Sequence, residues 1–239
     1  MGLPVSKKEL DRLGDRLRDS AVPSVEDLRL LEMVRPHYRS ALDAVCKVLE
    51  DMSLRPTFRQ KNRETIVDKL RRETDMRFSR VQDIVGTRVV RAMSLVAQDE
   101  LVAAVAAKFP ENRIRDRRRE PSFGYRAVHI VVKLDGIPVE IQVRTQLQHT
   151  WAQTMERLGD YWGRMVRYGG EPLDPERAHL VAAGGQPKSR HEWIELVKIL
   201  SSTIAADEQA GTTSLIEVEG LPGKWTARQL LDLLHNSDL

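Results

Sequence analysis

The sequence predicts an α/β (α+β) fold, a mixed β-sheet of about five strands flanked by helices. Short runs rich in β-branched residues stand between longer stretches in which apolar residues recur at helical spacing. A chain of 239 residues, 41% of them hydrophobic, is long enough for a domain with a sizeable core. No apolar run approaches the length of a membrane span. These observations favour a folded enzyme or binding domain and no membrane partner.

The composition also bears on compartment and charge. The N-terminal stretch is polar and has no apolar signal-peptide core, and the chain has one cysteine, Cys46. Both features are typical of a cytoplasmic protein in a reducing compartment. The net charge of +3 implies no general affinity for polyanions, but the basic residues are clustered.

Residues 1–52 are predicted to form N-terminal helices packed on the core. Leucines at helical spacing indicate a short surface helix over residues 6–19. Ser24 has the side chain and position of an N-cap for the next helix. Pro36 is expected to interrupt that helix, whose apolar stripe then continues to about residue 52.

Residues 53–74 form a basic segment with a helix in its second half. Arg59 and Lys61 precede this helix, and Thr65 and Lys69 lie on it. The cations could belong to a solvated helix face. They could also bind a polyphosphate, because cations and a hydroxyl would converge near a helix N-terminus.

Residues 81–93 are predicted to form a buried strand that contains two unusual charges, Asp83 and Arg88. They could form a structural ion pair, or Asp83 could bind a divalent metal beside a nucleotide. Strict alternation places the two side chains on opposite faces. We therefore predict a β-bulge at Gly86 that brings both to one face.

A helix over residues 95–109 is followed by an arginine-rich stretch, residues 111–124. Ile114 indicates a short strand there, and a loop follows it. The stretch is either solvated surface or an anion-binding loop. Its arginines are Arg113, Arg115, Arg117, Arg118 and Arg119.

Residues 124–144 are predicted to form a β-hairpin closed by Asp135-Gly136, a dipeptide favoured in two-residue turns. This register places Leu134 opposite Ile137. One face is then apolar: Val128, Ile130, Val132, Val139, Ile141 and Val143. The other face is polar, and is either solvated or functional, because buried charge is costly unless it is used or paired. It carries Tyr125, His129, Glu140, Gln142 and Arg144.

Thr145 is predicted to cap a long helix whose apolar stripe packs in the core, with His149 off the stripe and exposed. Residues 168–188 contain two Gly-Gly pairs and three prolines, which indicates a mobile connection. A helix over 189–209, a short strand over 215–218 and a last helix over 226–234 follow. The predicted divisions are thus 1–52, a core at 53–168, and a connection with a helical extension at 169–239.

Four motifs, in order and at suitable spacing, resemble the synthetase domain of the RelA/SpoT family over roughly residues 50–165. They are Arg59-x-Lys61-x-x-x-Thr65-Ile66-x-x-Lys69-Leu70, Asp83-Ile84-x-Gly86-x-Arg88-Val89, Gly124-Tyr125-Arg126-x-x-His129 and Glu140-Ile141-Gln142-x-Arg144-Thr145. The resemblance implies the family's nucleotidyltransferase-like fold. It also implies a pyrophosphokinase that moves the β,γ-diphosphate of ATP onto a ribose 3′-hydroxyl. No histidine is followed by aspartate, so the family's hydrolase motif is missing, as expected of a small, synthesis-only alarmone synthetase.

The resemblance also implies roles for single residues. Asp83 and Glu140 would hold Mg²⁺, and Glu140 could act as general base on the 3′-hydroxyl. The implied ATP-binding residues are Arg59, Lys61, Thr65, Lys69 and Arg88, with the two arginines sandwiching the adenine. The implied acceptor-binding residues are Tyr125, which would stack on the base, and His129, Gln142, Arg144, Arg115 and Arg117.

The acceptor is suggested by a departure from the family pattern. Residues 120–124 lack the Pro-Lys pair with which alarmone synthetases contact a guanosine nucleotide, and residues 148–153 resemble the toxic small alarmone synthetases. This favours the 3′-CCA end of tRNA as acceptor, with inhibition of translation and an antitoxin protein as partner. The alternative is a (p)ppGpp synthetase of the stringent response that uses GDP or GTP. A non-catalytic RNA- or nucleotide-binding module is a remote alternative, because Asp83 and Glu140 are both present.

Overall fold

The computed structural model of the protein describes residues 2–181 and 184–237, which form two compact units. The first unit comprises the described residues of Met1–Val89, Val102–Arg115 and His129–Val143. The second comprises those of Val90–Leu101, Asp116–Val128 and Arg144–Leu239. No helix in the described part of the chain is both long and apolar enough to cross a membrane.

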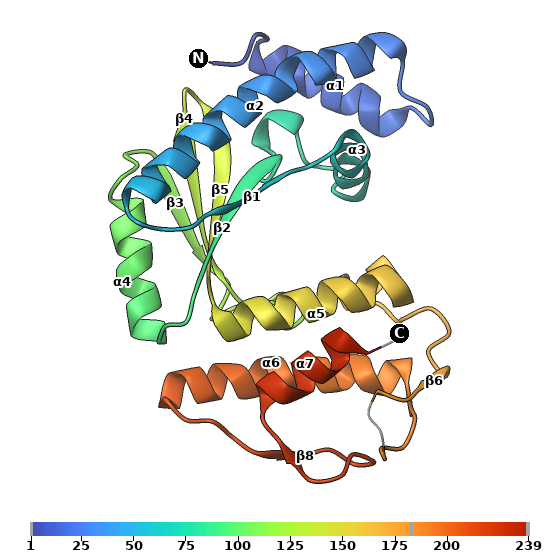
Figure 1. The fold of residues 1–239 in the computed structure, drawn as a ribbon. Coiled ribbons are helices and arrows are strands. Elements are labelled where there is room, and N and C mark those ends of the chain that lie inside the picture. Colours follow the sequence, from blue (N-terminus) through green and yellow to red (C-terminus); the bar gives the residue numbers. More distant parts are fainter. Residues whose placement is uncertain (1, 182–183, 238–239) are drawn as a thin grey trace. The chain divides into compact units, whose positions relative to one another are not determined.

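A five-stranded sheet in the order β1-β2-β5-β4-β3 organises the first part of the chain (Figure 1). This arrangement confirms the predicted mixed sheet with flanking helices. The strands are β1 (Thr57–Gln60), β2 (Val85–Arg91), β3 (Asn112–Asp116), β4 (Val128–Leu134) and β5 (Ile137–Thr145). The accompanying helices are α1 (Lys7–Asp19), α2 (Val25–Asp51), α3 (Arg63–Arg72), the 3-10 turn η1 (Phe78–Arg80) and α4 (Leu95–Ala106).

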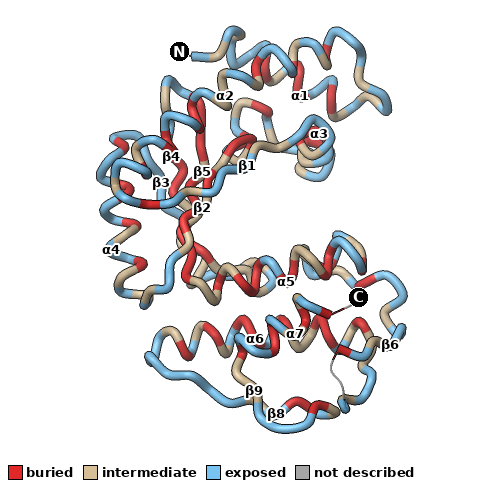
Figure 2. The backbone as a smooth tube through the Cα atoms, viewed as in Figure 1, coloured by how far each residue is buried: buried red, intermediate tan, exposed pale blue. Residues whose placement is uncertain are grey.

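The predicted hairpin is formed by β4 and β5. Asp135 and Gly136 have φ angles of 51° and 79°, the left-handed conformation that a two-residue type I′ turn requires at both positions. The predicted apolar face is the core face, and Figure 2 colours much of β4 and β5 as buried. Its six residues are each at most 1% exposed: Val128, Ile130, Val132, Val139, Ile141 and Val143.

The N-terminal helices depart from the prediction at Pro36. Helix α2 continues through this proline as one helix of 27 residues, capped by Ser24 as expected. Pro36 is exposed, so water can satisfy the carbonyl that loses its helical partner. Val34 and Tyr38 are buried on either side of it, and their packing sustains the helix.

The second unit is built around an apolar core shared by three helices. The predicted stripe of α5 is buried at Trp151, Met155, Leu158 and Trp162. The other two helices contribute Trp193, Val197, Leu200, Ile204, Leu230, Leu231 and Leu234. The elements are α5 (Gln146–Trp162), η2 (Arg164–Tyr168), β6 (Ala178–His179), β7 (Lys188–Ser189), α6 (Arg190–Ala210), β8 (Ile216–Glu217), β9 (Lys224–Trp225) and α7 (Ala227–Asn236).

The exposure of His149 and the structure of the predicted connection both differ from the predictions. His149 is half-buried rather than exposed, because α5 packs over more of its circumference than the stripe alone. The connection predicted at 168–188 contains the paired strands β6 and β7. Residues 182 and 183 of that connection, and 238 and 239 of the predicted extension, lie outside the described residues.

Candidate functional site

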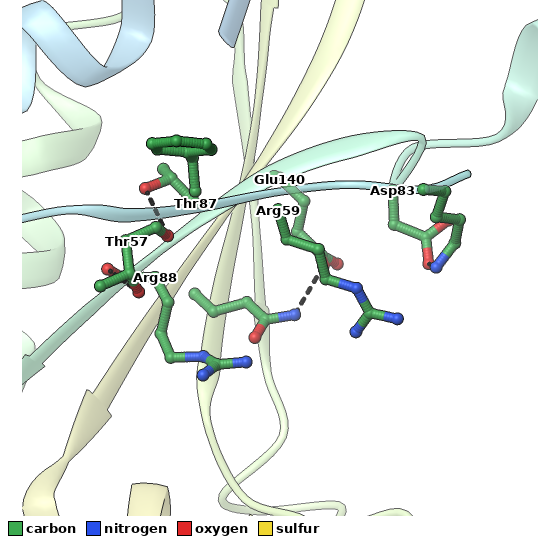
Figure 3. Close-up of a pocket in the computed structure, with 10 residues that line it drawn as sticks. Thr57, Arg59, Asp83, Thr87, Arg88 and Glu140 are labelled. Carbon is green, nitrogen blue, oxygen red and sulfur yellow. Dashed lines mark hydrogen bonds and ion pairs between the residues drawn. The ribbon is translucent and has the colours of Figure 1, made fainter. Parts of the chain in front are cut away.

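Strands β1 and β2 bring two arginines to one face of the sheet. Their antiparallel register pairs Thr57 with Arg88 and Arg59 with Gly86. Because side chains alternate along a strand, Arg59 and Arg88 share a face, and Figure 3 shows them extending to the same side. Strand β1 was not predicted, since a four-residue strand that is largely exposed has no buried alternation to reveal it.

Asp83 reaches the same site by a route other than the predicted bulge. The register of β2 against β1 is regular from Val85 to Arg88, so no bulge occurs at Gly86 on this side. Asp83 lies before the strand begins, where alternation does not apply. The Lys61 backbone N–H donates to the Ile84 carbonyl oxygen (2.9 Å), which holds this segment beside β1.

Gly86 allows β2 to approach β5 closely. A Cβ atom at this position would lie 2.9 Å from the backbone oxygen of Glu140, closer than side chains tolerate. A glycine is therefore required by packing rather than by its backbone angles. The consequence is that Arg88 on β2 and Glu140 on β5 line one pocket.

Two lysines converge on Asp83. The ammonium groups of Lys61 and Lys69 each lie 3.2 Å from a carboxylate oxygen of Asp83, and Lys69 also lies 3.1 Å from Glu73. Burial by itself would lower the pKa of Lys69, but the carboxylates of Asp83 and Glu73 outweigh it and raise that pKa. Lys69 is therefore protonated at neutral pH.

Helix α3 begins next to this cluster. Its N-cap is Asn62, whose side chain accepts hydrogen bonds from the backbone N–H and the hydroxyl of Thr65 (2.9 and 2.7 Å). The predicted ATP-binding hydroxyl therefore lies in the first turn of the helix, engaged with its cap. Lys69 lies one turn further along the same helix.

Glu140 forms the second acidic position, on β5. One carboxylate oxygen lies 2.9 Å from Nδ1 of His129, and the other accepts a hydrogen bond from the Gln142 amide (2.8 Å). Burial would raise the pKa of Glu140, but the interactions with His129, Gln142 and Lys61 outweigh it and lower the pKa from 4.5 to about 2. Glu140 is therefore a carboxylate at any physiological pH. These contacts place three of the predicted polar-face residues together.

A pocket of about 200 Å³ joins these groups within the first unit (Figure 3). It is lined by Thr57, Phe58, Arg59, Lys61, Asp83, Gly86, Thr87, Arg88, Glu140 and Gln142. Thr57, Phe58 and Thr87 were not expected at the site. Phe58 is 60% exposed, and the Arg39 guanidinium lies 4.4 Å from the centroid of its ring. No local sequence signal indicates this contact.

The donor set of the pocket fits Mg²⁺ bound together with phosphates. The described residues contain no cluster of three or more His, Cys, Asp or Glu side chains that could hold a metal by itself. Mg²⁺ commonly binds one or two carboxylates and takes its other ligands from substrate phosphates and water. Asp83 and Glu140 supply two carboxylates, and the buried Oδ1 of Asp83 accepts no hydrogen bond, although the Lys69 ammonium lies nearby.

The remaining predicted acceptor residues are divided between the units. In the second unit, the Arg144 guanidinium lies 4.9 Å from the ring centroid of Tyr125 and donates to its hydroxyl (2.9 Å). Tyr125 is not part of the hairpin, because β4 begins at Val128. Arg115 is exposed on β3, and the Arg117 backbone N–H donates to the Ala127 carbonyl oxygen (2.9 Å).

The arginines of residues 113–119 are not equivalent. Arg118 donates to the side chains of Asp116, Asp99 and Gln98, so it is occupied within the second unit. Arg113, Arg115 and Arg119 are exposed. The five arginines look alike in the sequence, although only three of them are exposed.

Comparisons with known proteins agree with the geometry. Residues 58–161 match the sequence model of a region found in RelA and SpoT proteins. Uncharacterized proteins of Mycobacterium tuberculosis and Mycobacterium bovis are 33% identical over 211 residues, which cover 86% of this chain and 75% of each relative.

Among solved structures, the chain is similar to two small alarmone synthetases of Bacillus subtilis. Synthetase 2 is 20% identical with a TM-score of 0.52, covering 74% of this chain and 92% of that one. Synthetase 1, bound to its product pppGpp, is 21% identical with a TM-score of 0.50, covering 76% of this chain and 96% of that one. At this identity the likeness shows a shared fold, as the motifs predicted.

Proposed function

The chain belongs to the RelA/SpoT family, and from this premise we propose that it is an ATP-dependent pyrophosphokinase. It would transfer the β,γ-diphosphate of ATP to a ribose 3′-hydroxyl. The observation that carries the proposal is the pocket of the first unit, where two carboxylates, one lysine and two arginines surround one space. Asp83, Glu140, Lys61, Arg59 and Arg88 line it. Lys69 contacts Asp83 from α3.

The reaction explains why these residue types are needed. The 3′-oxygen of the acceptor forms a bond to the β-phosphorus of ATP, the bond between that phosphorus and the α,β-bridging oxygen breaks, and AMP leaves. Such transfer depends on positioning and charge neutralisation more than on covalent help from the protein. The ammonium groups of Lys61 and Lys69, which pair with Asp83, would neutralise phosphate oxygens.

Asp83 and Glu140 would hold Mg²⁺, which neutralises phosphate charge when bound. The pKa of about 2 suits Glu140 to this role, since the carboxyl group is ionised at neutral pH. The same low pKa makes it a weak base. It can still accept the proton of the 3′-hydroxyl if that proton leaves late, as a loose transition state permits.

Arg59 and Arg88 would stack on the two sides of the adenine. Their shared face on adjacent strands and their planar guanidinium groups support this assignment. The adenine would then bind at the β1 and β2 edge, and the triphosphate would extend towards Asp83 and Lys61.

For the acceptor we propose the 3′ end of a tRNA, as in a toxin that blocks translation and is neutralised by an antitoxin. The support is the set of exposed arginines Arg113, Arg115 and Arg119, which suit RNA phosphates beyond the terminal nucleotide. The second candidate is GDP or GTP, favoured by the fold shared with a Bacillus subtilis synthetase whose product is pppGpp. In either case Tyr125 would stack on the acceptor base.

The test uses ATP labelled at the γ-phosphate, Mg²⁺, and either deacylated tRNA or GDP and GTP. Label on tRNA alone supports the first acceptor, and label only in guanosine tetra- or pentaphosphate refutes it. Glu140→Gln should abolish transfer to whichever acceptor is used. The matched control is Glu100→Gln, an exposed position of α4. Full activity of Glu140→Gln would refute the proposed mechanism, and no transfer by the unmodified protein would refute the function.

A further inference from the structure

We propose that helix α6 of the C-terminal extension positions the acceptor-binding pair Tyr125 and Arg144, and that Ser201 and Glu208 are the positioning residues. This inference rests on the proposed function, since it assigns the extension a role in acceptor binding. All the contacts concerned lie within the second unit. Ser201 and Glu208 lie outside the four motifs that carry the family resemblance.

Tyr125 is the last residue of a tight turn, residues 122–125, which we call the acceptor turn. Ser122 and Tyr125 exchange backbone hydrogen bonds (3.3 and 3.0 Å). Between them, Phe123 and Gly124 have φ angles of 52° and 90°. Two successive left-handed residues are typical of a type I′ turn, and a non-glycine residue such as Phe123 adopts this conformation at a cost. The surroundings must therefore hold the turn in place.

Ser201 of α6 is one of the groups that hold it. Its hydroxyl donates to the Gly124 carbonyl oxygen and accepts a hydrogen bond from Nε of Arg126 (3.2 Å). Ser201 is 2% exposed, so water cannot replace it readily. The hydroxyl thus joins the residues on either side of Tyr125 to one point of α6.

The turn is also in direct contact with the helices. A Cβ atom on Gly124 would lie 2.7 Å from the Trp151 ring and 3.4 Å from Ser201. Trp151 is itself fixed to α6, because its indole N–H donates to the Val197 carbonyl oxygen (2.7 Å). The acceptor turn therefore packs directly against α5 and α6.

Glu208 forms the corresponding hydrogen bonds next to Arg144. Its carboxylate accepts hydrogen bonds from the hydroxyl of Thr145, the neighbour of Arg144, and from the Gln148 amide (3.0 Å). Ser201 and Glu208 lie seven residues apart on one helix, close to two turns, so they face the same side. Residues of one helix thus form hydrogen bonds with the chain neighbours of both Tyr125 and Arg144.

The experiment compares Ser201→Ala and Glu208→Ala with Ser202→Ala and Gln209→Ala, exposed neighbours that serve as matched controls. The KM values for ATP and for the acceptor used by the unmodified protein are measured separately. Hydrogen exchange of the amides of residues 122–126 is measured without nucleotide. We expect each α6 variant to raise the acceptor KM about threefold to tenfold, as for one lost hydrogen bond, with the ATP KM unchanged. Ser201→Ala should also speed exchange in the acceptor turn, and neither control should change any of these values.

Several outcomes would overturn the proposal. One is an unchanged acceptor KM in Ser201→Ala, whatever the exchange rates. Another is an equal rise of both KM values, which would indicate general destabilisation. If the unmodified protein transfers no label to either acceptor, the proposed function fails. In that case, the hydrogen-exchange measurement still tests the proposal. If the amides of residues 122–126 exchange in Ser201→Ala at the rate of the unmodified protein, Ser201 of α6 does not hold the acceptor turn.

Discussion

Replacing His129 by alanine should destabilise the first unit through Glu140. The interactions around Glu140 lower its pKa from 4.5 to about 2, which corresponds to roughly 3 kcal/mol favouring the ionised form. His129, 2.9 Å from a carboxylate oxygen of Glu140, contributes the largest of these favourable interactions. We therefore expect His129→Ala to lower the free energy of unfolding by about 2 kcal/mol at pH 7.

The sign of the pH dependence follows from the lowered pKa. A carboxyl with a folded-state pKa below its unfolded value stabilises the protein above about pH 4.5, and this stabilisation is lost as the pH falls towards 2. The difference between unmodified protein and variant should therefore shrink as the pH is lowered below 4.5. The assay is urea unfolding in EDTA without nucleotide, from pH 7 downward.

The control is His37→Ala, a half-buried histidine on α2. It should change the free energy of unfolding by less than about 1 kcal/mol, as expected away from buried ion pairs. The reasoning is refuted if His129→Ala unfolds like the unmodified protein at pH 7. It is equally refuted if the destabilisation persists undiminished at acid pH.

Three further changes should have specific effects. Gly86→Ala should lower the free energy of unfolding by about 1–3 kcal/mol and raise the ATP KM, because the added Cβ would lie 2.9 Å from the β5 backbone. Thermal unfolding identical to that of the unmodified protein would contradict this steric effect. Arg88→Lys should raise the ATP KM about tenfold through loss of planar stacking. The control Arg91→Lys, at an exposed position of the same strand, should leave the ATP KM unchanged. An ATP KM of Arg88→Lys equal to that of the unmodified protein would exclude the stacking role. Burial and the nearby Arg190 lower the pKa of His179, so folding stability should fall as the pH drops below 6.5. His179→Gln should flatten that slope in unfolding curves, and a slope unchanged by the substitution would rule out this origin.

Much of the fold was predictable because its signals are local. Asp135-Gly136 specifies a turn that needs two left-handed residues, and that turn determines which hairpin residues share the core face. Caps such as Ser24 and Thr145 act within one helical turn, so short sequence windows reveal them. The grouping of His129, Glu140 and Gln142 also follows from alternation along adjacent strands.

The sequence by itself therefore determined most of the helices, the hairpin with its polar face, and the charged residues available to a nucleotide. Only the tertiary structure decided which of them meet. Asp83 joins the pocket from outside its strand, and Arg118 is occupied by Asp116 and Asp99. Ser201 holds a turn 77 residues earlier in the chain. The physical reason is that hydrogen bonding and alternation along an element act between near neighbours, whereas these contacts depend on packing between distant segments, which no short window of sequence encodes.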